Sequence, residues 1–362
     1  MTLSGISFGC QPKAETQSIN MTTSMRKKVE TFIDGLQNDI VTALEQLDPD
    51  APKFKRDAWI RASGGRGLSC VFACTPEGGQ TTSTLQTKLE KAGVNVSVVH
   101  GILPPAAIQE MRADHSSLPY DEKTSLPFFA AGISLVVHPR SPFDPTVHAN
   151  YRYFEITEQA AEGEQTGKIV AWWFGGGSDL TPSYLDEEDA RHFHTTLKDA
   201  CQNDELYSTF KKWCDEYFFI PHRQETRGIG GLFFDDLSNE KHARISEGVE
   251  RPRDPEEIFE FISRLGNAFI PSYIPLLQKK RDIPADHHRR WQLLRRGRYV
   301  EFNLVYDRGT KFGLKTPSAR IESILMSLPE TARWEYMSEL GTQAGSEEGR
   351  IVAVLKNPRN WV

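Results

Sequence analysis

The chain has 362 residues and a formal net charge of −6, which excludes a general polyanion binder and requires a local Arg or Lys cluster for any anionic ligand. Hydrophobic residues at 38% and charged residues at 25% supply a core and exclude wholesale disorder. No stretch approaches the roughly 18–20 apolar residues that span a bilayer.

The five cysteines are too few and too widely spaced for a disulfide framework or a zinc site: Cys10, Cys70, Cys74, Cys201 and Cys214. A reducing compartment is the simpler interpretation. Residues 1–23 carry no apolar signal core and few charges, so we expect a flexible N-terminal tail, a domain over residues 24–362 and a cytoplasmic location.

The first predicted element is a helix over residues 24–47, because apolar residues from Val29 to Leu47 recur at helical spacing. Residues 59–73 predict two strands joined by a glycine turn. β-Branched or alternating segments predict further strands at residues 94–100, 132–138, 150–156 and 169–174, the last ending at Gly175. The short Pro-bearing connector before residue 150 favours antiparallel neighbours.

Helices are expected at residues 186–201, 205–219 and from Asp254 onward, with a strand at 228–236 between them. Residues 299–314 predict a hairpin around Asp307-Arg308-Gly309-Thr310. Thr316-Pro317 then opens a helix that Pro329 stops. Since no repeat or linker divides the chain, the pattern predicts one α+β domain around a largely antiparallel sheet.

Two of these strands carry side chains suited to a ligand site. Side chains alternate across a strand, so Ser134 and His138 share one face, and His148, Asn150 and Arg152 share one face of the next strand. Neighbouring strands would bring together a hydroxyl, two imidazoles, an amide and a guanidinium. The alternative is a solvated sheet face.

Two further segments extend this hypothesis. The glycines at 175–177 allow close backbone approach to a ligand, with Asp179 beyond them as an acceptor of N–H bonds; a turn with Asp179 capping a helix is the alternative. Residues 316–320 offer backbone N–H groups and Arg320 at a helix N-terminus, which suits a carboxylate.

Other polar clusters have structural interpretations. His192 and His194 point to different sides of a helix, and His222 fits a capping or surface role. Residues 287–298 are strongly basic, which fits a solvated helix face, a nucleic-acid patch or an anion site. The chain lacks the glycine motifs of nucleotide-binding loops.

Several long motifs resemble the oxygen-dependent coproporphyrinogen III oxidase family, and the likeness runs from about Met25 to Val362. The motifs are Trp172–Pro182, Phe210–Phe218, Arg227–Leu237, Arg295–Thr310, Arg320–Pro329 and Arg333–Tyr336. The resemblance implies a large antiparallel sheet flanked by helices on both faces, a deep cleft over one sheet face, and a homodimer formed through residues 300–335.

The resemblance also implies site residues. Ser134, Asn150, Tyr151 and Arg152 match substrate contacts, as does the triplet Ser318-Ala319-Arg320, where the family usually has Gly in place of Ser318. His148 matches a proton-transfer residue. We expect Asp179 to hold pyrrole N–H groups with a raised pKa, and Arg152 and Arg320 to bind propionates. Some members are described with a metal at positions matching His138, His148, His194 and His222; we expect none here.

The implied reaction converts two propionates of coproporphyrinogen III to vinyl groups and yields protoporphyrinogen IX for haem synthesis. Dioxygen is the co-substrate, and no cofactor is required because an electron-rich pyrrole can itself reduce dioxygen. We expect no nucleic-acid partner and no membrane span. The rival hypotheses are a catalytically silent tetrapyrrole carrier, a metal-dependent oxidoreductase and a nucleic-acid-binding protein.

Overall fold

The structure is a computed structural model, and it describes residues 24–62, 64–73, 87–112, 118, 123–160, 166–315 and 319–362. Its helices are α1 (Met25–Gln46), α2 (Pro105–Met111), α3 (Glu187–Cys201), α4 (Asp204–Tyr217), α5 (Pro255–Asn267), α6 (Phe269–Gln278), α7 (Asp286–Val305), α8 (Arg308–Lys315), α9 (Ile321–Leu325) and α10 (Glu347–Lys356). The predicted tail lies outside the described residues.

The centre of the fold is a seven-stranded sheet in the order β1-β2-β3-β4-β5-β6-β9, and every neighbouring pair in it is antiparallel. The strands are β1 (Lys55–Ile60), β2 (Gly65–Ala73), β3 (Leu89–Leu103), β4 (Leu126–Pro139), β5 (Thr146–Thr157), β6 (Ile169–Thr181) and β9 (Gly231–Leu237), with a separate pair of β7 (Phe219–Ile220) and β8 (Glu225–Thr226).

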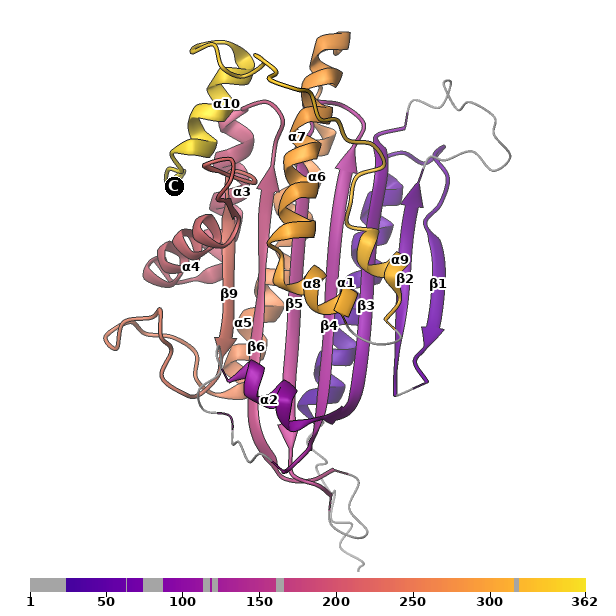
Figure 1. Cartoon of the computed structure of the whole chain (residues 1–362), viewed down its shortest axis with the longest axis vertical. Coiled ribbons are helices and arrows are strands. Elements are labelled where there is room, and N and C mark those ends of the chain that lie inside the picture. Colours follow the sequence, from indigo (N-terminus) through magenta and orange to yellow (C-terminus); the bar gives the residue numbers. More distant parts are fainter. Residues whose placement is uncertain are drawn as a thin grey trace, which may run out of the picture.

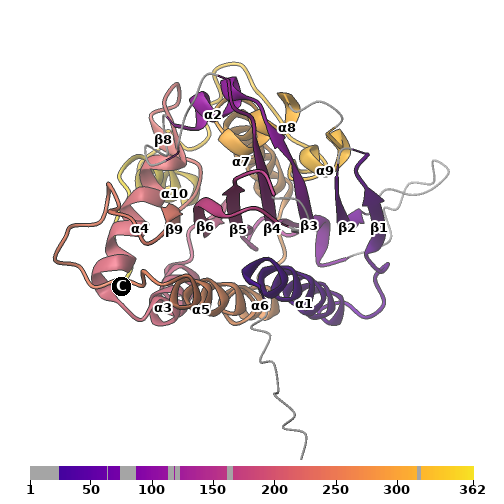
Figure 2. The ribbon, with the colours of Figure 1, turned by 90° about the horizontal axis from the view of Figure 1, so that it is seen from below.

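Helices cover both faces of the sheet (Figure 1). Figure 2 shows α1, α3, α5 and α6 below the strands and α7, α8 and α9 above them. This arrangement confirms the predicted α+β class with a large antiparallel sheet between helical layers. No helix in the described part of the chain has the length and apolar character needed to cross a membrane.

The layer of α1 against the sheet forms the main hydrophobic core. Val29, Ile33 and Ile40 of the predicted stripe are buried there, and Ile133 and Leu135 of β4 face the same core, as alternation predicted. Gln37 ties the helix to the strands, because its Nε2 donates to the carbonyls of Leu68 and Val94 at 2.8 and 2.7 Å. This face of the sheet is therefore packed core, and the polar side chains of β4 and β5 lie on the other face.

The segment predicted as a hairpin over residues 299–314 is helical instead, which corrects that prediction. Its first half completes α7, and its second half is α8. Asp307 begins α8 rather than a turn, since its Oδ2 accepts from the backbone N–H of Thr310 at 2.7 Å. The predicted helix from Thr316 appears only as α9, and residues 316–318 are not described.

The basic stretch at residues 287–298 lies in α7, and its arginines form ion pairs. Arg295 binds Glu225 at 2.7 Å and Arg296 binds Glu90 at 2.6 Å, all four being buried. Arg290 binds Glu335 at 2.6 Å near the surface. Of the three interpretations left open for this stretch, a solvated helix face is wrong for the buried pairs, which anchor α7 to β8 and to β3.

Candidate functional site

A row of polar side chains crosses the sheet on the face beneath α7–α9. Register places Asp57 of β1 opposite Ser69, Ser69 opposite Asn95, Asn95 opposite Ser134, and Ser134 opposite Asn150. Directly opposed residues share a face, so these five form one line, here called the polar row. The predicted pairing of the Ser134 and Asn150 strands is therefore confirmed.

Strand β5 presents the candidate residues at alternate positions. His148, Asn150 and Arg152 lie on the polar-row face, as predicted from the period of two. Within the described residues, Asn150 Oδ1 is buried and accepts no hydrogen bond. Since buried polar atoms are normally paired, this amide oxygen is a ready acceptor for a ligand N–H group.

His148 and Asp179 form the most specific pair in the site. They are opposed across β5 and β6, and His148 Nδ1 lies 2.8 Å from Asp179 Oδ1. The sequence predicted that β6 would end at Gly175, but the strand continues through the glycines and so carries Asp179 opposite His148. The carboxylate accepts from Nδ1–H, which leaves Nε2 of a 22% exposed imidazole for a ligand.

Arg227 completes this pair; it begins one of the family-like motifs but was not among the predicted site residues. Its Nη2 lies 2.9 and 2.8 Å from Oδ1 and Oδ2 of Asp179, and both side chains are buried. Burial alone would raise the pKa of Asp179, but the Arg227 guanidinium and His148 lower it below the ordinary value. The expected raised pKa is therefore wrong, because the prediction lacked the arginine.

Arg152 lies across β6 toward β9. Its Nη2 donates to Asp235 Oδ2 at 2.6 Å, and Arg308 of α8 lies 3.6 Å from the same oxygen. Gly175 makes room for the contact, since a Cβ there would lie 2.5 Å from Asp235 Oδ1. Asp307 also lies close enough to act on the charge of Arg152, so two arginines meet two carboxylates here, and the guanidinium groups remain suited to a bidentate anionic ligand group. Asp235 and Arg308 were also missing from the predicted site residues, although both lie within the family-like motifs.

The predicted second carboxylate-binding segment lies at the other edge of the sheet. Arg320 pairs with Asp57 of β1, four strands from Arg152, or roughly 19 Å at ordinary strand spacing. The structure therefore does not bring Arg152 and Arg320 together. Ala319 precedes Arg320 outside any helix, and Ser318 is not described.

Tyr151 belongs to the opposite face of the sheet. Its side chain is buried in the main core, and its hydroxyl lies 3.1 Å from Leu265 O. Any contact between Tyr151 and a ligand on the polar-row face would involve its backbone alone. Alternation along β5 produces this result, because Tyr151 falls between Asn150 and Arg152.

The four histidines considered for a metal have separate protein partners. His138 Nε2 lies 2.9 Å from Ser327 O, His194 Nδ1 lies 2.7 Å from Tyr207 Oη, and His222 lies on the surface beside Tyr306 and Glu301. Across the residues that the structure describes, no group of three or more His, Cys, Asp or Glu side chains is arranged to hold a metal ion. His194 is buried, and His222 lies at the surface.

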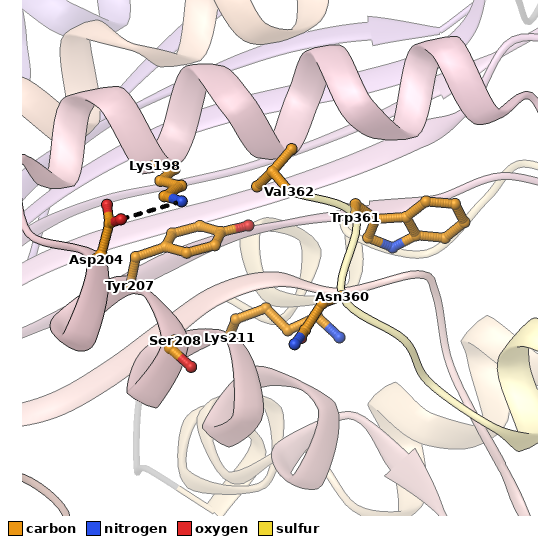
Figure 3. Close-up of a pocket in the computed structure, with 8 residues that line it drawn as sticks. All are labelled: Lys198, Asp204, Tyr207, Ser208, Lys211, Asn360, Trp361 and Val362. Atoms are coloured by element: carbon orange, nitrogen blue, oxygen red, sulfur yellow. Dashed lines mark ion pairs between the residues drawn. The ribbon is translucent and has the colours of Figure 1, made fainter.

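A small cavity lies away from these residues, between α3, α4 and the C-terminal segment (Figure 3). Its volume is about 70 Å³, and its lining is Lys198, Asp204, Tyr207, Ser208, Lys211, Asn360, Trp361 and Val362. Small-molecule sites usually exceed about 300 Å³. This cavity is too small for a macrocycle and contains none of the predicted site residues.

Comparison with known proteins agrees with the motifs. The family model described as coproporphyrinogen III oxidase matches residues 28–361. A Drosophila melanogaster protein named oxygen-dependent coproporphyrinogen-III oxidase is 52% identical over 94% of this chain and 79% of its own length. A chloroplastic enzyme of that name from Glycine max is 48% identical over 94% of this chain and 80% of its own. The mitochondrial enzyme of that name from Homo sapiens is 49% identical over 93% of this chain and 67% of its own length. The chain belongs to the coproporphyrinogen III oxidase family.

Proposed function

We propose that this protein oxidises coproporphyrinogen III with dioxygen to give protoporphyrinogen IX in haem synthesis. Two propionates become vinyl groups. For each one, the carboxylate leaves as carbon dioxide, the methylene group next to the pyrrole ring loses a proton, and the two electrons released reduce dioxygen, with that proton and a second one, to hydrogen peroxide. Family membership supports the reaction, and the names of the relatives supply its substrate and its dependence on oxygen.

The observation that carries the proposal is the set of complementary groups along β5. A reduced tetrapyrrole offers pyrrole N–H donors, acidic protons and carboxylates. Within five residues, β5 offers an unpaired amide oxygen at Asn150, an imidazole nitrogen at His148 and a guanidinium at Arg152. Ser134, directly opposite Asn150, adds a hydroxyl. Each ligand group would have one matching partner on a rigid strand.

Substrate binding would begin with the carboxylates. Arg152 and Arg308 would take one propionate beside Asp235, since planar guanidinium groups bind carboxylates in a bidentate way. Ala319 and Arg320, with Ser318, would bind another arm after Arg320 exchanges Asp57 for the ligand. Backbone groups of Tyr151, on the same strand as Arg152, would contact the substrate. The macrocycle would then lie along the polar row, and the predicted cleft over this face remains a proposal.

Proton transfer would use His148, with Asp179 as its partner. Removal of a pyrrole N–H proton makes the macrocycle electron-rich enough to reduce dioxygen, so neither flavin nor haem is needed. His148 Nε2 is the more exposed basic atom, whereas Asp179 is 1% exposed and already binds His148 and Arg227. We therefore assign proton transfer to His148. Asp179 would hold the His148 imidazole in place. Asp179 would contact pyrrole N–H groups only if the substrate reached the buried carboxylate.

A second copy of the chain would complete the assembly. Residues 300–335 include an apolar surface on α7, α8 and α9, made of the exposed side chains Leu304, Val305, Phe312, Leu314 and Ile321. Contiguous exposed apolar residues often mark protein interfaces. We propose a homodimer through this surface. Light scattering of the wild type should give twice the mass of one chain. Phe312→Glu should reduce the measured mass to that of a single chain, whereas Ile60→Glu, on the exposed edge of β1, should leave the dimer intact.

The cytoplasmic location expected from the sequence is retained as a proposal. Relatives in the comparison are named mitochondrial and chloroplastic, so the location needs its own measurement. Microscopy of the full chain with a C-terminal fluorescent tag, scored against organelle markers, would decide between these compartments.

One assay separates the proposed function from its rivals. The enzyme and coproporphyrinogen III are incubated with and without oxygen, and carbon dioxide and the fluorescent oxidised product are measured. We expect product only with oxygen, at an unchanged rate after chelator treatment. A carrier would bind the substrate without releasing carbon dioxide. A metal-dependent enzyme would lose activity to the chelator, and either result would contradict the proposal.

A further inference from the structure

We infer that Arg227 is a positioning residue of the reaction: it holds Asp179 as the anion that fixes the Nδ1–H tautomer of His148, and Nε2 thereby becomes the proton-transfer atom. The inference rests on the proposed function, and it assigns a task to a buried side chain that lies between the sheet and α7. Arg227 itself would not touch the substrate.

The geometry around Asp179 supports this assignment. Oδ1 is shared, because it lies 2.8 Å from His148 Nδ1 and 2.9 Å from Arg227 Nη2. Oδ2 lies 2.8 Å from the same Nη2. A carboxylate oxygen held from one side by a guanidinium has its remaining lone pair directed elsewhere, here toward the imidazole. The orientation of His148 is thus set by a chain of two contacts.

Arg227 is itself held with little freedom. Its backbone N–H donates to Phe218 O at 2.8 Å, and Nη1 donates to Asn303 Oδ1 at 2.8 Å. The guanidinium carbon lies 4.0 Å from the ring centre of Phe218 and 4.5 Å from that of Tyr299. Aromatic faces stabilise a cation and keep water away. These contacts come from Phe218, at the end of α4, and from Tyr299 and Asn303 of α7, so two separate parts of the fold position one charge.

The same Phe218 ring also contacts His148, with ring centres 5.9 Å apart in an edge-to-face arrangement. Phe218 therefore lies against both ends of the chain of contacts. The ring restricts rotation of the imidazole, while Asp179 fixes which nitrogen carries the proton. A neutral imidazole has two tautomers, and only the one protonated on Nδ1 offers a basic Nε2.

The charge of Arg227 is needed because Asp179 is buried. A buried carboxyl without a counter-cation favours its protonated form. A protonated Asp179 could donate to Nδ1 as well as accept from it, and the tautomer of His148 would no longer be fixed. Arg227 removes this ambiguity, which a neutral residue of similar size would restore.

The test compares Arg227→Gln, Arg227→Lys and the matched variant Arg295→Gln. Arg295 is also buried and paired with a carboxylate, Glu225, but it does not contact Asp179. We expect Arg227→Gln to lower kcat by at least tenfold with KM changed less than twofold, and Arg227→Lys to recover part of that loss. Arg295→Gln should lower the melting temperature but leave kcat per folded molecule unchanged.

A spectroscopic readout does not depend on turnover. Nitrogen NMR of histidine-labelled protein should show His148, identified with His148→Gln, as the Nδ1–H tautomer in the wild type and as a mixture in Arg227→Gln. An unchanged tautomer together with an unchanged kcat would overturn the inference. If the substrate assay failed in the wild type while the tautomer responded as expected, the proposed function would fall and the positioning role would stand.

A variant that fails to fold would still leave a test. Arg227→Gln combined with Asp179→Asn removes both buried charges and keeps the volumes, so we expect a folded protein with low kcat and mixed tautomers. Wild-type kcat in this double variant would show that neither charge positions His148, and would refute the inference.

Discussion

Arg152 provides the sharpest test of substrate binding on the polar-row face. We expect Arg152→Gln to lower kcat/KM by about tenfold to 150-fold, because a hydrogen bond to a charged group contributes about 1.5–3 kcal/mol and each 1.4 kcal/mol is a factor of ten. Stability should fall by less than about 1 kcal/mol, since the Arg152 side chain is 40% exposed and Arg308 remains near Asp235.

The assay for Arg152→Gln is steady-state oxidation of coproporphyrinogen III in air, with products separated by the number of vinyl groups. A matched control is Arg66→Gln, because Arg66 is 42% exposed and pairs with Asp34 of α1 on the opposite face of the sheet. The control should keep wild-type kcat/KM. If Arg152→Gln remained within twofold of the wild type, or if Arg66→Gln lost as much activity, the assignment of Arg152 to a propionate would be wrong.

Three further predictions concern the support of the site. Gly175→Ala should disturb the Arg152–Asp235 pair and lower kcat/KM several-fold, whereas Gly35→Ala, with nothing within 4 Å of its Cβ position, should leave activity unchanged and stabilise α1 by up to about 1 kcal/mol; equal activity in both variants would contradict this. Arg295→Met should lower the free energy of unfolding in urea by up to about 3 kcal/mol, because it leaves buried Glu225 with only the more distant Arg298, at 3.9 Å, and Glu225→Gln in the same chain should recover part of this loss; no recovery would refute the pairing. Burial would raise the pKa of Glu301, but hydrogen bonds from Arg223, His222 and Trp334 lower it to about 2, so its contribution to stability is present above the unfolded pKa and is lost as pH falls toward 2. The difference in melting temperature between wild type and Glu301→Gln should therefore be constant from pH 7 to 5 and shrink below about 4.5; a difference that grew on acidification would contradict the assignment.

The sheet could be read from the sequence because its strands are long and their patterns are regular. Ile133 and Leu135 alternate with Ser134, and one side of β4 is consequently apolar and the other polar. The same alternation aligned His148, Asn150 and Arg152 on one face before any strand pairing was known. Helix α5 was equally clear, since Asp254, Pro255 and Glu257 form a complete N-terminal cap.

The hairpin prediction failed at a point where local signals have two meanings. The sequence Asp307-Arg308-Gly309-Thr310 is typical of a turn. An Asp side chain can equally cap the first turn of a helix, as Asp307 does for α8. Valine and tyrosine in residues 299–306 favoured strand locally. Packing of Phe302 in a buried cluster and ion pairs of Arg295 and Arg296 decided for the helix.

The sequence alone determined the fold class, the family and the face on which β5 presents its polar residues, since each depends on local periodicity or on long motifs. Tertiary structure decided which charges meet. Arg227 lies 48 residues from Asp179, and Asp235 lies 83 residues from Arg152. Periodicity assigns a side chain to a face, but it carries no information about a partner on a distant strand. For that reason the sequence predicted a raised pKa for Asp179, and only the fold supplied the cation that lowers it.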